Sequence, residues 1–203
     1  MIQATINLIV AFFGGIRMKK IEKNTIYFRL FEDAFFDKYE YMDEFLKKNA
    51  RGHGVLLLNY LDLLVAVPLR SSLNPHIKKR QYIFPYEVWI KGDGKEYLKA
   101  MDFSKLLIIT KEDLRGSIGF IFRDNKEKEY YQENYNKIIM RLTRYITDYV
   151  KLCDKIDKGE QVSLRKLKLY RYSTLRNFHS ELKINISKHD LIETLKKYSL
   201  YDY

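Results

Sequence analysis

The sequence predicts an α+β protein, an antiparallel sheet with helices segregated against it. Two observations lead to this prediction. Strand-like apolar runs separated by turn residues fill the first two thirds of the 203 residues, and apolar residues at helical spacing fill the last third. Strands that precede helices, rather than alternate with them, favour an antiparallel sheet.

The first seventeen residues stand apart from this pattern. Their apolar run, Ile6 to Phe13, is too short to cross a bilayer as a helix, and no basic segment precedes it as in a secretory signal. Met18 begins the segment M-K-K-I-E-K-N-T-I-Y-F, which is typical of the natural start of a protein. We interpret residues 1–17 as an upstream extension or a local strand, with a membrane anchor as the alternative, and expect one domain over residues 18–203.

The strands are expected in order along the chain. Residues 25–29 form a strand that leads into a helix over 32–48. Val55 to Tyr60 and Leu63 to Pro68 flank a turn at Leu61-Asp62 and predict a hairpin whose register the turn does not define. Pro85 interrupts the strand expected over 81–90, which favours an edge or a bulge. A turn at 92–94 and strands over 106–110 and 118–123 complete the set.

Helices are expected from about residue 127 onward. A long amphipathic helix covers 127–155, and Cys153 is expected to be a small buried residue of this helix. Two shorter helices are expected over 173–182 and 187–198. Ser187 and Asp190 have the spacing of a capping box at the start of the last helix.

Composition limits the functions that fit this chain. Lys and Arg number 37 against 26 Asp and Glu, a net charge of +11 that favours an anionic partner. An apolar content of 46% excludes a disordered polycation. One cysteine excludes an internal disulfide framework and fits a reducing compartment such as the cytoplasm.

Two acid-free segments hold much of the positive charge. The first, Arg70 to Arg80, contains four basic residues, and the second, residues 161–180, contains five. Each segment is interpreted either as part of an anion-binding surface or as an ordinary solvated face. Neither a Gly-rich phosphate loop nor a metal-binding spacing occurs, so no cofactor or metal is expected.

The end of the second hairpin strand carries the chemistry expected of a site. Pro68 is followed within eight residues by Arg70, two serines, Asn74 and His76. Arginine binds phosphate, hydroxyls donate to its oxygens, and histidine transfers protons near neutral pH. Arg51 precedes the first hairpin strand, so the hairpin would bring Arg51 and Arg70 to one place. An ordinary polar loop is the alternative.

Five blocks of the sequence carry a resemblance to a known family. They are R-G-H-G-V-L-L-L-N at 51–59, V-P-L-R-S at 67–71, M-D-F-S-K-L-L-I-I at 101–109, the long amphipathic helix, and Y-S-T-L-R-N-F-H-S-E-L at 172–182. Together, from about Lys19 to about Ile184, they resemble the ToxN/AbiQ-type toxins of type III toxin–antitoxin systems, closest to the TenpN and CptN branches.

The resemblance implies a highly twisted, barrel-like antiparallel sheet and a metal-independent endoribonuclease. It implies attack of the RNA 2′-hydroxyl on the adjacent phosphate, which leaves a 2′,3′-cyclic phosphate. It also implies a small RNA antitoxin encoded as tandem repeats, which the toxin processes and which inhibits it in an RNA-bridged assembly, with a role in phage defence.

The family's pocket residues carry over onto Arg51 and Ser71. The sequence departs from the family at three positions: Arg70 replaces a hydroxyl residue, Leu73 replaces a lysine, and Lys47 replaces a tyrosine. The role of the family lysine that Leu73 replaces would pass to His76, Lys78 or Arg70, or the pocket works differently in this branch of the family.

These considerations define the candidate site. Arg51 and Arg70 would bind the scissile phosphate, His76 would transfer protons, and Ser71 would position an oxygen. The expected RNA contacts are Lys47, Asn74, Lys78, Lys79, Arg80, Lys105, Arg165, Lys166, Lys168 and Arg171.

Aromatic residues near these cations have two interpretations. We expect a helix whose packing face is formed by Tyr172, Leu175, Phe178 and Leu182. We interpret Tyr82, Tyr86 and Trp89 first as core residues and second as platforms on which bases stack. Two other functions remain open: a non-catalytic RNA-binding protein, and a peripheral membrane protein that uses the apolar N-terminus.

Overall fold

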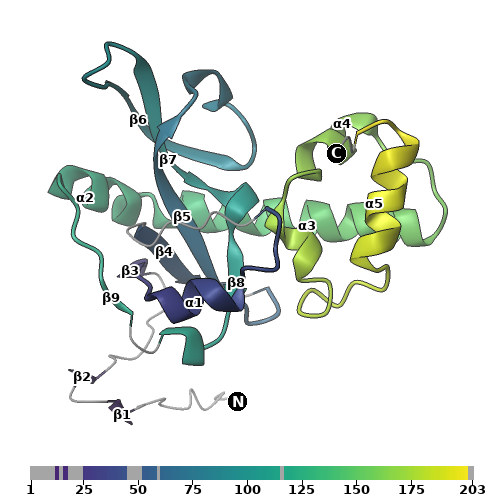
Figure 1. Cartoon of the computed structure of the whole chain (residues 1–203), viewed down its shortest axis with the longest axis horizontal. Helices are drawn as coiled ribbons and strands as arrows, with labels where there is room; N and C mark the ends of the chain where they lie inside the picture. Colours follow the sequence, from purple (N-terminus) through teal and green to yellow (C-terminus); the bar gives the residue numbers. More distant parts are fainter. Residues whose placement is uncertain are drawn as a thin grey trace, which may run out of the picture.

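The computed structural model describes residues 12–13, 16–17, 25–44, 52–58, 60–114 and 117–200. Seven of its strands form one antiparallel sheet flanked by helices (Figure 1), which confirms the α+β prediction. Most of the expected extension 1–17 lies outside the described residues. Its two described pieces, β1 (Phe12–Phe13) and β2 (Ile16–Arg17), pair with each other.

The sheet has the strand order β6-β7-β5-β4-β3-β9, and β8 also pairs with β5. This order of the described strands is open, with β6 and β9 at its two ends. The strands are β3 (Tyr27–Leu30), β4 (Gly52–Leu57), β5 (Leu64–Leu73), β6 (Ile83–Ile90), β7 (Glu96–Asp102), β8 (Leu107–Ile109) and β9 (Ile118–Gly119).

The central strand β5 connects the buried and the exposed parts of the sheet. Its first half pairs with β4 and β8, where side chains from Leu64 to Pro68 are buried. Its second half pairs with β7, where Leu69 and Arg70 are half-buried and Ser71 is exposed. The polar end of β5 therefore leaves the core just before Arg70.

The predicted β4–β5 hairpin is confirmed, and its turn explains the register. His53 pairs with Pro68, and Leu63 donates its backbone N–H to Tyr60 O at 3.2 Å. Both central turn residues are left-handed, with φ of 54° at Leu61 and 51° at Asp62. A type I′ turn has this conformation, which the absence of glycine concealed in the sequence.

The expected position of Pro85 is also confirmed. β6 is an end strand of the sheet, and its pairing with β7 shifts register between Pro85 and Glu87. The turn at 92–94 forms, with Gly94 at φ 75°. Strand β7 was not predicted, because charged residues from Lys95 to Lys99 obscure its alternation of buried and exposed positions.

Two of the predicted helices differ from the observed ones. α1 (Asp33–Lys38) is shorter than the 32–48 expected, of which residues 45–48 lie outside the described residues. The long helix is divided into α2 (Asn125–Glu133) and α3 (Tyr135–Asp157) at Asn134. Asn134 is the C-cap of α2: its side-chain amide donates to Tyr130 O at 2.9 Å, and the same carbonyl accepts its backbone N–H at 3.1 Å.

The apolar stripe of α3 is buried as predicted. It includes Cys153, whose thiol is fully buried, and this burial raises its pKa to about 12. The expected role of Cys153 as a buried residue is thereby confirmed. The buried residues of α3 are Ile138, Leu142, Tyr145, Ile146, Tyr149, Leu152 and Cys153.

The chain after α3 combines a confirmed and an incorrect prediction. α5 (Lys188–Lys197) begins with the predicted capping box of Ser187 and Asp190. The helix expected over 173–182 is wrong: the structure has the single 3₁₀ turn η4 (Thr174–Asn177) there, capped by Ser173, and the Asn177 side chain donates to the Thr174 carbonyl in place of a continued helical bond. A further helix, α4 (Leu164–Tyr170), was not predicted.

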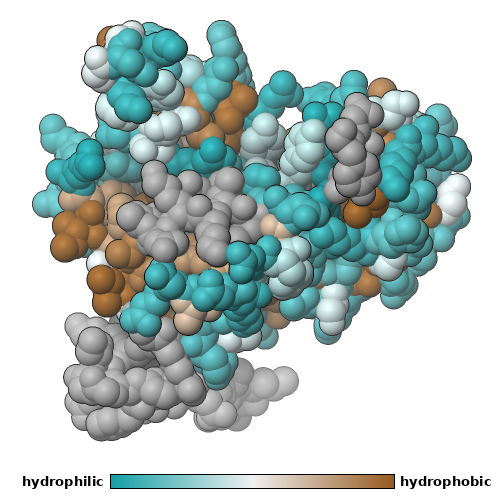
Figure 2. Space-filling view, viewed as in Figure 1, coloured by the Kyte–Doolittle hydropathy of each residue, from teal (hydrophilic) through white to brown (hydrophobic). Residues whose placement is uncertain are grey.

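One large hydrophobic core joins the sheet to the helices, and it includes buried residues from Ile26 to Leu200. In Figure 1, α3 passes behind the sheet and leads to α4 and α5, which lie beside the sheet. Figure 2 shows mostly hydrophilic side chains on this helical part, whereas apolar side chains gather near β9 and α2, where Ile118 and Ile121 are exposed. No helix in the described ranges has the length and apolar character needed to cross a membrane.

Candidate functional site

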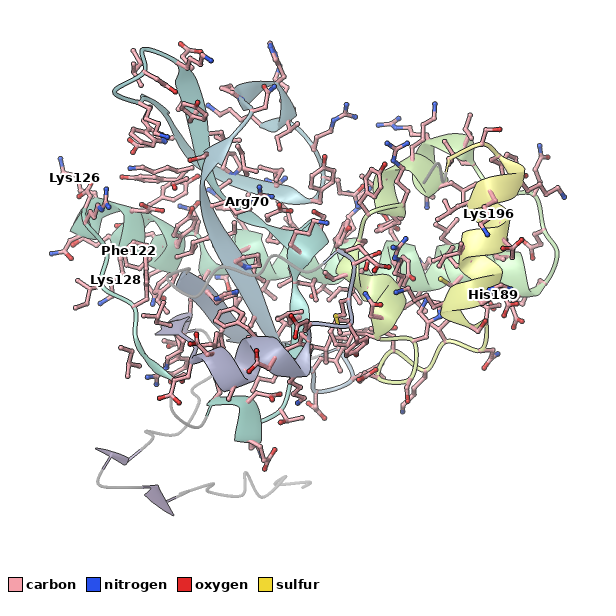
Figure 3. All side chains as sticks on the ribbon, in the orientation of Figure 1. Arg70, Phe122, Lys126, Lys128, His189 and Lys196 are labelled. Carbon is pink, nitrogen blue, oxygen red and sulfur yellow. The ribbon has the colours of Figure 1, made fainter. Side chains whose placement is uncertain are left out.

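Arg70 forms an ion pair at the point where β5 leaves the core. It pairs in register with Ala100 of β7, and its Nη1 donates to Asp102 Oδ2 at 2.8 Å. The Arg70 side chain is 26% exposed, whereas Asp102 is almost completely buried. A buried carboxylate thus holds the guanidinium of a partly exposed arginine, which is labelled in Figure 3.

The position of Asp102 is set by its place at the end of β7. Its Oδ1 accepts the Ser104 backbone N–H at 3.1 Å and the Ser104 hydroxyl at 2.6 Å, which caps the 3₁₀ turn η2 (Phe103–Lys105). The aspartate therefore contacts both a local turn and a cation 32 residues away. Such a carboxylate orients Arg70 and is not itself accessible to a ligand.

Lys105 ends the same turn and places a second cation near Arg70. Its Nζ donates to Tyr172 O at 2.8 Å. Burial lowers the pKa of Lys105; the negative charge of Asp102 opposes this effect, and the positive charge of Arg70 adds to it. Tyr82 lies near Asp102. Burial raises the pKa of the Tyr82 hydroxyl, and the negative charge of Asp102 raises it further.

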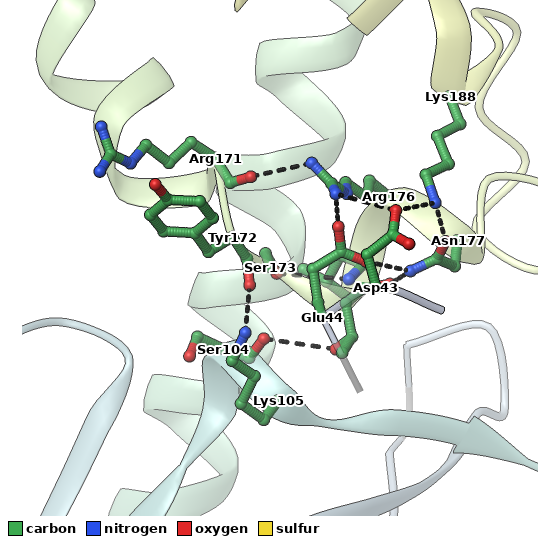
Figure 4. Close-up of polar contacts among 12 residues, drawn as sticks. Asp43, Glu44, Ser104, Lys105, Arg171, Tyr172, Ser173, Arg176, Asn177 and Lys188 are labelled. Atoms are coloured by element: carbon green, nitrogen blue, oxygen red, sulfur yellow. Dashed lines mark hydrogen bonds and ion pairs between the residues drawn. The ribbon is translucent and has the colours of Figure 1, made fainter. Parts of the chain in front are cut away.

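The same turn joins the two basic segments identified in the sequence. Thr174 donates its hydroxyl to Ser104 O at 3.3 Å and to Leu106 O, and Lys105 binds the carbonyl of Tyr172 (Figure 4). The segment 161–180 therefore meets η2, about 70 residues away in the sequence, through direct hydrogen bonds, and Arg70 of β5 reaches the same turn through its ion pair with Asp102. We name Arg70, Asp102 and Lys105 the Arg70 cluster.

The remaining polar and basic residues of the first basic segment lie at and after the outer end of β5, where Leu73 is buried. Ser71 and Ser72 lie where the β5–β7 register shifts, and Trp89 donates its indole N–H to Ser71 O at 2.7 Å. Asn74 Oδ1 caps the 3₁₀ turn η1 (Pro75–Ile77) by accepting the His76 backbone N–H at 2.9 Å. Lys78, Lys79 and Arg80 follow, and their side chains are exposed.

The predicted catalytic residues are brought together only in part. Arg70 pairs with Asp102, whereas Ser71 lies where the β5–β7 register shifts, and among the described residues its hydroxyl makes no hydrogen bond to Arg70 or Asp102. In the described part of the chain, no hydrogen bond or ion pair joins the His76 ring to Arg70 or Ser71. Arg51 and Lys47 lie outside the described residues.

The second basic segment is presented mainly by α4. Leu167 and Tyr170 bury one side of this helix, and Arg165, Lys166 and Lys168 are exposed on the other. Lys166 Nζ lies 4.0 Å from Asp148 Oδ1, and Arg171 caps the helix. The four cations expected to contact RNA are therefore on or next to α4.

Arg176 behaves differently from the other cations of the segment. It is buried, forms an ion pair with the buried carboxylate of Glu44, and lies 3.9 Å from Asp43 Oδ2. Its charge is compensated inside the protein by an acid 132 positions away in the sequence.

The aromatic predictions have mixed outcomes. Leu175, Phe178 and Leu182 are buried as expected, but Tyr172 is 53% exposed and was wrongly placed on the packing face. Tyr82, Tyr86 and Trp89 are half-buried.

Asp102 is the site residue that the sequence analysis missed. Its signal was present in M-D-F-S-K, because an aspartate two residues before a serine at the end of a strand is typical of a capped turn. No group of three or more His, Cys, Asp or Glu side chains suited to a metal occurs among the described residues. A hollow between α1 and β8, lined by Lys38, Tyr39 and Glu181 among others, is a separate feature from the cluster.

Comparisons of the chain with protein-family models, with curated proteins and with solved structures found no match.

Proposed function

We propose that this protein is a metal-independent endoribonuclease, the toxin of a type III toxin–antitoxin system. One observation carries the proposal: the two acid-free basic segments meet at η2, around an arginine held by a buried aspartate and a lysine with a lowered pKa. A surface of this kind, open and cationic, suits a polyanionic macromolecule better than a small ligand.

The proposed reaction needs no group beyond those of protein and RNA. The 2′-hydroxyl loses its proton and its oxygen bonds to the adjacent phosphorus, while the bond from phosphorus to the 5′-oxygen breaks. The leaving 5′-oxygen takes up a proton, and the products are a 2′,3′-cyclic phosphate and a 5′-hydroxyl. Catalysis then requires cations around the phosphorane and groups that move protons.

Arg70 and Lys105 are the residues that the geometry favours for this work. Arg70 uses Nη1 on Asp102 and presents its outer face to the phosphate, so Asp102 is a positioning residue. Lys105 donates one N–H to Tyr172 O. As an ammonium with three donors it keeps others for a phosphate oxygen or for the leaving 5′-oxygen. Burial brings its pKa closer to the range useful for proton transfer.

The other sequence-derived assignments stay predictions within this proposal. At the polar end of β5, Ser71 would position an oxygen of the bound nucleotide and His76 would transfer a proton. Arg51 would add a second phosphate contact. The further contacts proposed are Lys47, Asn74, Lys78, Lys79 and Arg80. The barrel-like closure of the sheet and a cytoplasmic location belong to the same proposal.

The proposed partner of α4 is the antitoxin, a small structured RNA encoded as tandem repeats. Arg165, Lys166 and Lys168 present three cations on one exposed helix, next to Arg171, a pattern suited to phosphates along a folded RNA. The assembly would be bridged by RNA and would release the toxin during phage infection.

A non-catalytic RNA-binding protein is the second candidate. It is favoured by one observation: the described residues show no contact between His76 and either Arg70 or Ser71. Binding without cleavage is the outcome that would support it.

The experiment is an incubation of the purified protein with total RNA in the presence of a chelator. We expect fragments that end in a 2′,3′-cyclic phosphate, and a loss of at least about 100-fold in cleavage rate for Arg70→Ala and for Lys105→Ala. Lys196→Ala is the matched control for the lysine, because Lys196 lies on the outer helix α5 (Figure 3) and pairs with Glu193.

A second pair of variants locates proton transfer. His76→Ala, compared with His189→Ala on α5, decides between His76 and Lys105: a loss in His76→Ala together with full activity in Lys105→Ala would assign the role to His76. Intact RNA with the wild-type protein would refute the enzyme, and tight binding of that intact RNA would favour the second candidate.

A further inference from the structure

Tyr172 is an exposed aromatic residue whose backbone carbonyl is bound by Lys105 of the Arg70 cluster. Its side chain is 53% exposed, and the Arg171 guanidinium lies over its ring at 4.3 Å from the centroid. Large exposed aromatic residues of a folded protein commonly mark a binding surface. The ring and the guanidinium are drawn together in Figure 4.

The backbone under this ring is fixed from several directions. Lys105 Nζ donates to Tyr172 O at 2.8 Å, and the buried Arg176 donates to Arg171 O at 3.0 Å. The next residue, Ser173, is fully buried and accepts the Tyr145 hydroxyl at 3.0 Å. The exposed ring therefore stands on a rigid support, which lowers the entropy lost when a ligand orders it.

We propose that Tyr172 and Arg171 form a binding site for one unpaired nucleobase of a single-stranded RNA. This inference rests on the proposed function and deepens it, because the site would hold a base next to the phosphate bound at the Arg70 cluster. An aromatic ring and a planar guanidinium are the two side-chain groups on which unpaired bases stack.

The surroundings favour a nucleotide over a protein partner. Lys105 ties Tyr172 to the cluster that contains Arg70, and α4 places exposed cations immediately before Arg171 in the chain. No acidic residue occurs between positions 161 and 180. A base on Tyr172 would thus have cations available on both sides for its flanking phosphates, whereas the large hydrophobic side chains that this segment exposes to a protein partner are limited to Leu164 and Tyr172.

The arrangement also explains the use of an arginine at this position. Arg171 lies against the ring it would share with a base, so its guanidinium would contribute stacking as well as charge. Replacement by lysine keeps the charge but removes the planar group.

The test uses a short 2′-O-methyl RNA of mixed sequence, labelled with a fluorophore, which the proposed reaction cannot cleave. Binding to the full chain is measured by anisotropy for wild type, Tyr172→Ala, Tyr172→Trp and Arg171→Lys. We expect about tenfold weaker binding for Tyr172→Ala, nearly unchanged binding for Tyr172→Trp, and an intermediate loss for Arg171→Lys. Tyr41→Ala is the control, because Tyr41 is comparably exposed, at 67%.

A set of the same RNA with one abasic position at a time provides the second measurement. One abasic position should weaken wild-type binding and leave Tyr172→Ala unaffected. Equal binding of wild type and Tyr172→Ala, or equal sensitivity of both to every abasic position, would overturn the proposed base site.

Cleavage of unmodified RNA is scored separately. Cleavage by wild type together with unchanged binding by Tyr172→Ala would refute the base site alone. Absence of cleavage together with Tyr172-dependent binding would refute the nuclease and support the base site.

Discussion

His179 lies between a tyrosine and a carbonyl inside the helical part. Its Nδ1 is 2.6 Å from Ile186 O, and its Nε2 is 2.6 Å from the Tyr149 hydroxyl. Because a carbonyl only accepts, Nδ1 carries the proton, and the neutral ring accepts from Tyr149 at Nε2. A neutral histidine therefore completes both hydrogen bonds.

The neutral state of His179 predicts a pH dependence of stability. Burial lowers the His179 pKa, while the Ile186 carbonyl and Asp190 partly oppose this effect. The unfolded chain takes up this proton near the ordinary pKa of about 6.5, so the unfolded state binds more protons as the pH falls through that value. We expect the free energy of unfolding, measured in urea, to decrease from pH 7.5 to pH 5.

The variant His179→Gln should show a smaller decrease than wild type over the same range. The exposed His189, replaced by Gln, serves as the control and should retain the wild-type slope. Parallel pH profiles for His179→Gln and wild type would contradict the assignment to His179.

At the scale of elements, local rules account for the parts that were predicted correctly. The Ser187–Asp190 capping box, the register shift of β6 at Pro85 and the turn of the β4–β5 hairpin depend on residues within a few positions of one another. The turn of that hairpin is the exception in detail, because Leu61 and Asp62 adopt left-handed backbone conformations that glycine or asparagine favours.

The turn is therefore a site where substitution should stabilise the protein. The double change Leu61→Asn and Asp62→Gly should raise the free energy of unfolding by about 1 kcal/mol, since both residues are then suited to positive φ. Chemical denaturation measures this gain. Gly94→Ala, at φ 75° in open space, should lower the free energy of unfolding. A loss of stability in the Leu61→Asn, Asp62→Gly variant would show that the turn is not under strain.

At the scale of the whole molecule, one buried ion pair connects distant parts of the chain. Glu44 follows α1, and Arg176 belongs to η4; both side chains are 2% exposed. Asn177 also donates to Glu44 Oε2 at 2.9 Å. This connection joins η4, which follows the exposed Tyr172, to the segment after α1.

Replacing both partners of this pair should lower the free energy of unfolding by less than the sum of the two single replacements. Glu44→Gln and Arg176→Met should each lower the free energy of unfolding by about 3 kcal/mol, because the remaining group is buried without its partner. The double variant should lose clearly less than the sum of the two single losses. Additive losses in a urea denaturation cycle would show that the two groups do not stabilise each other.

The candidate site divides in the same way between predictable and unpredictable parts. Arg70, the serines and the basic run after them were identified from their position at the end of a buried strand. Asp102 and the exposure of Tyr172 were not, because Asp102 binds a residue 32 positions away and Tyr172 is held by Lys105, 67 positions away. Arg176 was counted with the surface cations for the same reason, since its partner Glu44 is 132 positions distant.

The sequence by itself determined that this protein is an α+β chain with an excess of 11 positive charges, carried largely by two acid-free segments. Periodicity, capping residues and turn residues act over a few positions, so they are readable without a fold. Only the tertiary structure decided that the two segments meet at η2, that a buried aspartate holds Arg70, and that Tyr172 faces solvent. These facts depend on which distant residues share the core, and contacts of that kind form only when the sheet and the helices pack together.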